Sequence, residues 1–191
     1  MKPVSQMTRL EVACYIGAEF KRRNLSVVLS GGSCVSLYSS EKYVSADLDF
    51  VNMLFAKRHA IVEAMKALGF SEENRYFKHP ESEFMVEFPP GPLGVGEEPV
   101  KQIDEVTTPV GSVRLLSPTD CVKDRLTWFF HANDQQCLQQ AILVAQQNTV
   151  DLKEVERWSA TEGKLAAFNK IRPLLKPPHP AKGKLSSPLT K

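Results

Sequence analysis

Three short stretches of the chain carry residues that could bind phosphate and metal ions. Ser30-Gly31-Gly32-Ser33 follows an apolar run, and a glycine turn between a strand and a helix can present backbone N–H groups to an anion. Asp47-Leu48-Asp49 holds two carboxylates two residues apart. On a strand both would point to the same face, about 6.5 Å apart. Glu87 lies in a later apolar segment, residues 84–88. The three stretches together indicate a site for metal and phosphate.

The acidic residues also have a physical reason to share a cation. Asp47 and Glu87 each stand between apolar neighbours, where an unpaired carboxylate is costly to bury. Three such groups at one site repel one another, and hard carboxylate oxygens favour Mg²⁺ or Mn²⁺. Each motif alone has a plainer interpretation: Gly31-Gly32 as an ordinary turn, Asp47 and Asp49 as a solvated strand end, and Glu87 as a surface residue on an edge strand.

The first 116 residues alternate between helix and strand patterns that can position these groups. Thr8 and Glu11 form a capping-box signature, which predicts a first helix over residues 9–20. Apolar periodicity predicts a short helix after Gly32 and another over residues 57–68. Buried strands are expected at residues 25–29, 46–51 and 83–88, and a strand or hairpin at residues 103–106 and 110–116. Residues 89–96, rich in proline and glycine, are expected to form an exposed loop.

The pattern becomes helical at Ser117. Ser117-Pro118 is a strong helix start, and helices are expected to about residue 130, over 134–147, after a cap at Asp151, and between residues 163 and 173. The sequence therefore predicts an α+β fold, in which a small mixed β-sheet core flanked by helices (residues 1–116) is followed by a C-terminal helical bundle (117–175). Residues 176–191 lack apolar periodicity and are expected to be a disordered tail.

Composition narrows the class of protein and its partners. With 191 residues, 42% hydrophobic and 24% charged, the chain suits one globular domain with a helical appendage. A net charge of +2 gives no general affinity for nucleic acid. Only a local patch could supply such affinity, and its candidates are Lys21, Arg22, Arg23, Lys123 and Arg125. Four cysteines without a CxxC pair indicate reduced thiols. The N-terminus carries no apolar run suited to a signal or a membrane span, so we expect a cytoplasmic protein without a membrane partner.

The order and spacing of Gly31-Gly32-Ser33, Asp47-Leu48-Asp49 and Val86-Glu87-Phe88 resemble the nucleotidyltransferase superfamily of the DNA polymerase β type. Within it, residues 25–145 are most similar to minimal bacterial nucleotidyltransferases of the AbiEii toxin type. The resemblance implies that Gly31, Gly32 and Ser33 hold the phosphates of a nucleoside triphosphate. It also implies that Asp47, Asp49 and Glu87 bind the catalytic magnesium ions.

The C-terminal helices extend the resemblance. Lys123 matches a helical lysine of the family and Asp134 a later acid, which implies that both contribute to nucleotide binding, with Asp124 and Arg125 as flanking candidates. Lys123 could instead be a solvated lysine that pairs with Asp120, and Asp134 could be a helix cap. The chain departs from the family where Val51-Asn52 replaces a further acid and where Asn133 replaces an arginine.

The main functional hypothesis is a metal-dependent enzyme that transfers a nucleoside monophosphate from a nucleoside triphosphate to a hydroxyl group. Lys123 would neutralise phosphate charge, and Glu87 could accept the proton of the hydroxyl. The resemblance suggests tRNA or a protein as acceptor, and a toxin role with an antitoxin as partner. The alternative is a catalytically silent module of the same fold that binds a nucleotide or a partner.

Overall fold

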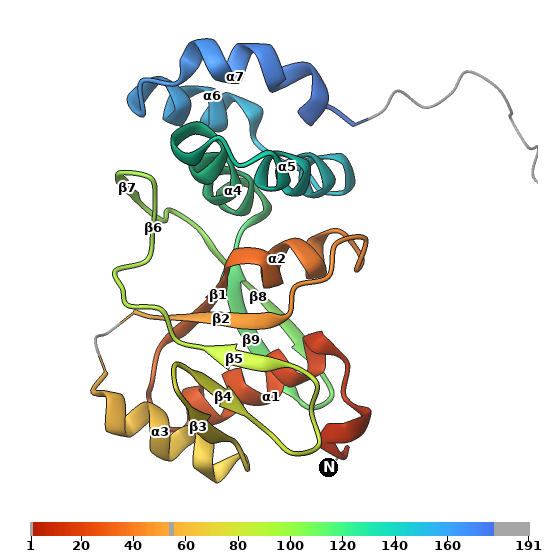
Figure 1. The fold of residues 1–191 in the computed structure, drawn as a ribbon, viewed down its shortest axis with the longest axis vertical. Helices are drawn as coiled ribbons and strands as arrows, with labels where there is room; N and C mark the ends of the chain where they lie inside the picture. Colours follow the sequence, from red (N-terminus) through yellow and green to blue (C-terminus); the bar gives the residue numbers. More distant parts are fainter. Residues whose placement is uncertain (1, 54–55, 178–191) are drawn as a thin grey trace, which may run out of the picture.

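The computed structural model describes residues 2–53 and 56–177 (Figure 1). Most elements lie where the sequence predicts them. The strands are β1 (Val27–Ser30), β2 (Asp47–Asn52), β3 (Ser71–Glu73), β4 (Tyr76–Lys78), β5 (Met85–Glu87), β6 (Gly94–Val95), β7 (Glu98–Pro99), β8 (Ile103–Thr108) and β9 (Gly111–Leu116). The helices are η1 (Val4–Gln6), α1 (Arg9–Arg22), α2 (Gly31–Tyr38), α3 (Arg58–Ala67), α4 (Pro118–Ala132), α5 (Gln135–Gln147), α6 (Leu152–Thr161), α7 (Leu165–Ile171) and η2 (Arg172–Leu175).

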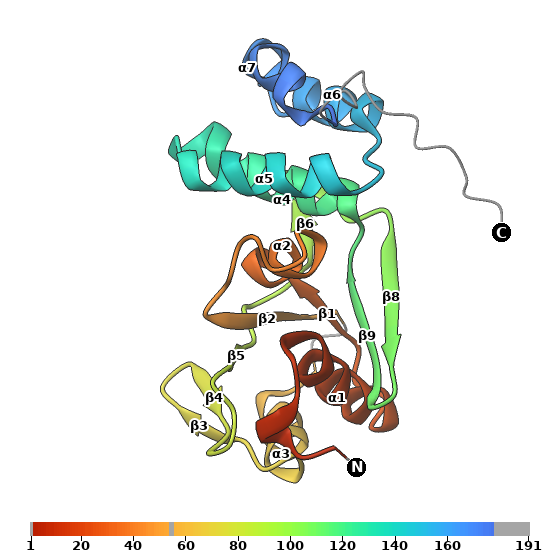
Figure 2. The ribbon, with the colours of Figure 1, turned by 90° about the vertical axis from the view of Figure 1, so that its right-hand side faces the viewer.

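A mixed sheet of seven strands forms the centre, in the order β3-β4-β5-β2-β1-β9-β8. β1 is antiparallel to β2 and parallel to β9, whereas β2 and β5 are parallel. Helices α1 and α3 lie on one side of this sheet and α2 on the other (Figures 1 and 2). The predicted α+β class, with a mixed sheet flanked by helices, is confirmed.

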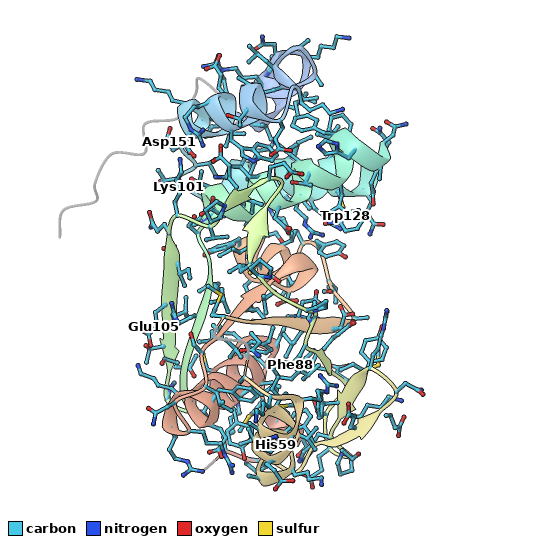
Figure 3. The ribbon with its side chains drawn as sticks, turned by 90° about the vertical axis from the view of Figure 1, so that its left-hand side faces the viewer. His59, Phe88, Lys101, Glu105, Trp128 and Asp151 are labelled. Atoms are coloured by element: carbon cyan, nitrogen blue, oxygen red, sulfur yellow. The ribbon has the colours of Figure 1, made fainter. Side chains whose placement is uncertain are left out.

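An aromatic core packs on the face of the sheet opposite α2. Phe88, labelled in Figure 3, lies at the centre of this core. It stacks on Phe20 of α1 with ring centroids 5.2 Å apart and on Phe50 of β2 at 5.9 Å, and its ring and that of Phe77 meet edge to face at 5.5 Å. Because neighbouring strand residues point to opposite faces, Phe50 and Phe88 in the core set Asp49 and Glu87 on the other face. Burial of these rings therefore fixes which way the acidic residues point.

The helical part begins as the sequence predicts. The Ser117 side chain accepts a hydrogen bond from the N–H of Asp120, and Pro118 occupies the first helical position. α2 lies between the sheet and the pair α4–α5, and α6 and α7 pack beyond that pair (Figure 1). Within the described residues no helix is both long and apolar enough to cross a bilayer. The division into two domains stays a prediction, and residues 178–191 of the predicted tail lie outside the described part.

Two short hairpins are absent from the sequence-based prediction. β3 and β4 form one beside β5, and β6 and β7 form the other. β6 lies within residues 89–96, which were expected to form an exposed loop. That expectation is wrong for Leu93 and Val95, which are buried, and the indole N–H of Trp158 donates to the carbonyl of Val95 at 3.0 Å. Proline and glycine correctly mark the turns here, but the apolar residues between them pack on the helical part.

Candidate active site

The structure brings the three predicted acids together. Parallel pairing sets Asp47 opposite Met85 and Asp49 opposite Glu87, so all three carboxylates lie on one face of β2 and β5. One oxygen from each lies within 4.8 Å of the others, and all three residues are partly buried. This is the arrangement that the alternation of Asp47 and Asp49 predicts, completed by a strand that is distant in sequence.

Serine hydroxyls fix the position of Asp47 and join α2 to β2. Ser45, which the sequence reading did not single out, donates to Asp47 Oδ1 at 3.0 Å. The Ser33 hydroxyl donates to the carbonyl of Asp47 at 2.6 Å and accepts from the N–H of Asp49 at 3.4 Å. Ser33 is fully buried, so its hydroxyl stabilises the contact between α2 and β2. The phosphate role of Ser33 stays a prediction, and only its backbone N–H could fill it. The sequence did hold a signal for the Ser45 contact, because Ser45 precedes Asp47 by two residues and can therefore reach its carboxylate.

The Asp49 carboxyl group is partly buried and lies near other negative charges. Burial raises its pKa to about 7, and the charges of Asp47 and Glu87 add to that shift. Desolvation and like charge both disfavour the ionised carboxyl. A divalent cation would reverse that balance, and a set of three carboxylate oxygens suits Mg²⁺ or Mn²⁺. The residues present therefore fit the metal that the sequence predicts.

The glycine turn touches this acidic cluster directly. Gly31 has a φ of 65°, in the left-handed region, and a Cβ atom there would collide with Asp49 Oδ2. The side chain of Ser30, the N-cap of α2, makes no capping hydrogen bond. The first N–H groups of α2 are thus left for another acceptor, beside the acids. The turn could therefore bind an anion beside the three carboxylates.

We predict that Gly31→Ala disables the site, and Gly163→Ala is its matched control. Both glycines have nearly the same left-handed backbone, with φ of 65° and 67°, but a Cβ at Gly163 meets nothing within 4 Å. Gly163→Ala should cost about 1–2 kcal/mol of stability through the backbone alone. Gly31→Ala should cost more and should also displace the Asp49 carboxylate. Chemical denaturation and titration with Mn²⁺ measure the two effects; equal costs with unchanged Mn²⁺ binding would contradict this account.

Lys123 does not fit the phosphate role predicted for it. Its side chain is fully buried, with Nζ 2.7 Å from Asp120 Oδ1 and 3.4 Å from Glu154 Oε1. An ammonium group enclosed in the helical part and held by two carboxylates is not available to a phosphate. The alternative interpretation was a solvated lysine that pairs with Asp120. The partner is confirmed, but the pair is buried.

Arg125, two residues along α4, lies nearer the acids. Its positive charge opposes the upward shift of the Asp49 pKa, whereas Asp124 adds to it. The guanidinium donates to Asp124 Oδ2 from Nε at 2.9 Å and from Nη2 at 2.5 Å, and Nη1 donates to Gln140 Oε1 at 3.3 Å. These bonds fix the guanidinium within the helical part, from where its charge acts on Asp49. Of the residues of α4 that the sequence singles out, Asp124 and Arg125 influence the charge of Asp49, and their part in the site stays a prediction.

Asp134 serves as a helix cap. Its carboxylate accepts a hydrogen bond from the N–H of Cys137 at 3.0 Å, at the start of α5. That bond lowers the pKa of Asp134, so the group is held ionised. The structure thus supports the capping alternative, and a contact between Asp134 and the nucleotide stays a prediction.

The predicted basic patch does not form as one surface. Lys21 pairs with Glu105 of β8, and Arg22 and Arg23 both pair with Glu19. Glu105 marks the edge of the sheet, well apart from α4 (Figure 3), and Lys123 is buried. The basic residues are separated because α1 and α4 lie on opposite sides of the sheet.

Comparison with known proteins supports the fold. No protein-family model and no curated protein matches the chain. Among solved structures, an antigenic nucleotidyltransferase-like protein from Paracoccidioides brasiliensis superposes with a TM-score of 0.60 at 13% identity, covering 88% of this chain and 94% of that one. The antibiotic-resistance factor ANT(2'')-Ia matches with a TM-score of 0.47, in solution (14% identity, 84% and 91% covered) and in complex with adenylyl-2"-tobramycin (15%, 83% and 95%). The first likeness shows a nucleotidyltransferase-like fold.

Proposed function

We propose that this protein is a metal-dependent nucleotidyltransferase, which moves a nucleoside monophosphate from a nucleoside triphosphate to a hydroxyl acceptor. The observation that carries the proposal is the convergence of Asp47, Asp49 and Glu87 beside the uncapped glycine turn of α2. A nucleotidyltransferase-like fold around these residues supports it. An acidic cluster alone would be weak grounds, but the glycine turn beside it could bind the phosphates of a nucleotide.

In this proposal the backbone N–H groups of Gly31, Gly32 and Ser33 bind the β- and γ-phosphates. Asp47, Asp49 and Glu87 would hold Mg²⁺ or Mn²⁺, which when bound neutralises phosphate charge and lowers the pKa of the acceptor hydroxyl. The acceptor oxygen attacks the α-phosphorus and forms a new P–O bond. The P–O bond to the β-phosphate breaks, pyrophosphate leaves with the electron pair, and Glu87 accepts the hydroxyl proton.

Arg125 takes the charge-neutralising role that the sequence reading gives to Lys123. Its guanidinium is fixed by Asp124 and Gln140 and acts electrostatically on Asp49. We predict that Arg125→Gln lowers kcat/KM for the nucleotide by about 10²-fold, the usual loss of one transition-state donor. Arg125→Lys should retain part of the activity, because charge is kept but the planar fork is lost.

A matched control for Arg125 is Arg157→Gln. Arg157 also binds carboxylates through its fork, those of Glu98 and Glu154, but in a surface cluster between β7 and α6. Steady-state kinetics of folded Arg157→Gln should match the wild type. Equal kcat/KM in Arg125→Gln and Arg157→Gln would remove Arg125 from the mechanism.

A transfer assay tests the proposed function. The protein is incubated with each of the four α-labelled nucleoside triphosphates, with Mg²⁺ or Mn²⁺, and with tRNA, protein and small hydroxyl acceptors. The expected result is label transferred to one acceptor class in a metal-dependent way, and transfer that survives Asp49→Asn would overturn the proposal. Nucleotide binding without turnover across this screen would favour the catalytically silent module. The toxin role, an antitoxin partner and the similarity to AbiEii-type enzymes stay predictions of the resemblance.

A further inference from the structure

A row of paired residues crosses four strands and continues past the acidic cluster. Ser30 of β1 is paired with Asp49 of β2, Asp49 with Glu87 of β5, and Glu87 with Tyr76 of β4. Residues paired in register on neighbouring strands point to the same face of a sheet. The row therefore begins at the glycine turn, the proposed site of the nucleotide phosphates, and ends at Tyr76. Tyr76 lies on the other side of Glu87 from the glycine turn. In the proposed mechanism Glu87 accepts the proton of the acceptor hydroxyl, so the acceptor would lie beside Glu87.

Arg75 lies at the Tyr76 end of the row and contacts both Tyr76 and Glu87. It occupies the two-residue turn between β3 and β4, after Asn74 with a φ of 57°. Its guanidinium lies over the Tyr76 ring, 4.8 Å from the centroid, and donates to the Tyr76 hydroxyl at 2.5 Å. Arg75 Nε lies 3.6 Å from Glu87 Oε1, and the side chain is 68% exposed. Its carboxylate partner is thus one of the acids of the proposed metal site.

Other basic side chains near Arg75 form ion pairs with glutamates that lie outside the acidic cluster. Arg58 pairs with Glu72 and Lys78 with Glu73. A divalent cation bound by Glu87 would repel Arg75 and would take up the carboxylate charge that now attracts it. The guanidinium would then present free N–H donors beside the acceptor side. A planar fork of donors suits the oxygens of a phosphate.

We propose that Arg75, stacked on Tyr76, binds a phosphate group of the acceptor, so that the acceptor is a phosphate-bearing hydroxyl compound. This inference rests on the proposed function and sharpens it by naming the charge class of the second substrate. Arg75 alternates between two partners: Glu87 without metal, and the acceptor phosphate once the acids hold a cation. Polycationic acceptors are disfavoured, because Arg75 would repel them.

Binding measurements with ribose 5-phosphate and ribose test the inference without knowledge of the natural acceptor. The full-length protein is loaded with Mn²⁺ and an α,β-methylene nucleotide analogue, and each sugar is titrated by calorimetry. Wild-type protein should bind ribose 5-phosphate at least about tenfold more tightly than ribose, as a charge-assisted contact would give. Arg75→Gln should bind the two sugars equally within about twofold. It should also bind Mn²⁺ alone about twofold to fivefold more tightly, because a cation is removed from Glu87.

The control is Arg58→Gln. Arg58 lies over Phe77 of the same strand, 4.9 Å from the ring centroid, and pairs with a glutamate, but that glutamate is not in the acidic cluster. Arg58→Gln should keep the preference for ribose 5-phosphate and the wild-type affinity for Mn²⁺. A preference that persists in Arg75→Gln, or is absent from wild type that binds Mn²⁺ and the analogue, would overturn this inference alone. Failure of wild type to bind Mn²⁺ and the analogue would overturn the proposed function and this inference with it.

Discussion

Asp49→Asn should lower the rate of nucleotidyl transfer by about 10³-fold or more and should also stabilise the metal-free protein. The loss of rate follows from removing the carboxylate at the centre of the cluster, which lies between Asp47, Glu87 and the Gly31 turn. The gain in stability follows because Asp49 is desolvated and is repelled by two other acids. A neutral amide of the same shape escapes both costs. The site is thus expected to sacrifice stability for function.

Thermal unfolding with and without Mn²⁺, beside the transfer assay, checks both halves of this prediction. Without metal the variant should melt higher, by about 2–4 °C for each kcal/mol gained. Mn²⁺ should raise the melting temperature of the wild type but not of the variant. Glu81→Gln is the control, since Glu81 is an exposed acid outside the cluster. A metal-free Asp49→Asn that melts lower than wild type would contradict the picture of a strained acidic site.

Lys123→Met should destabilise the fold by about 3–5 kcal/mol, the usual cost of leaving a buried charge without its partner. The ammonium group is fully buried between Asp120 of α4 and Glu154 of α6. Without it, the buried Asp120 carboxylate faces an apolar side chain. This should be the largest stability loss among the substitutions proposed, and denaturant unfolding measures it directly.

Lys101→Met is the matched control for Lys123. Lys101 Nζ lies 2.9 Å from the same Glu154 Oε1, but Lys101 is 54% exposed, so its loss should cost no more than about 1 kcal/mol. Under conditions in which both variants are folded, the KM for the nucleotide should equal that of wild type. A raised KM in folded Lys123→Met would restore the phosphate role that the sequence predicts for this lysine.

Elements with local sequence signals are predicted correctly. The capping box at Thr8 and Glu11 and the Ser117-Pro118 helix start are present as predicted, because each joins groups within one turn of chain. Alternation of Asp47, Leu48, Asp49 and Phe50 determined that both aspartates share a face, since the period of a strand is two. The two aspartates of the candidate site could be predicted from spacing for this reason, whereas Glu87 was predicted from its place between apolar residues on another strand.

Which other residues reach the site depends on long-range packing. Lys123 and Arg125 are two positions apart on a helix, and therefore point about 200° apart around its axis. Which of them faces the acids depends on how α4 packs on α2 and α6, and no local pattern encodes that. Arg75 and Tyr76 reach Glu87 only through the pairing of β4 with β5, a contact between short strands without a strong signal of their own. Local sequence placed the three acids on their strands, whereas packing selected the cations that surround them.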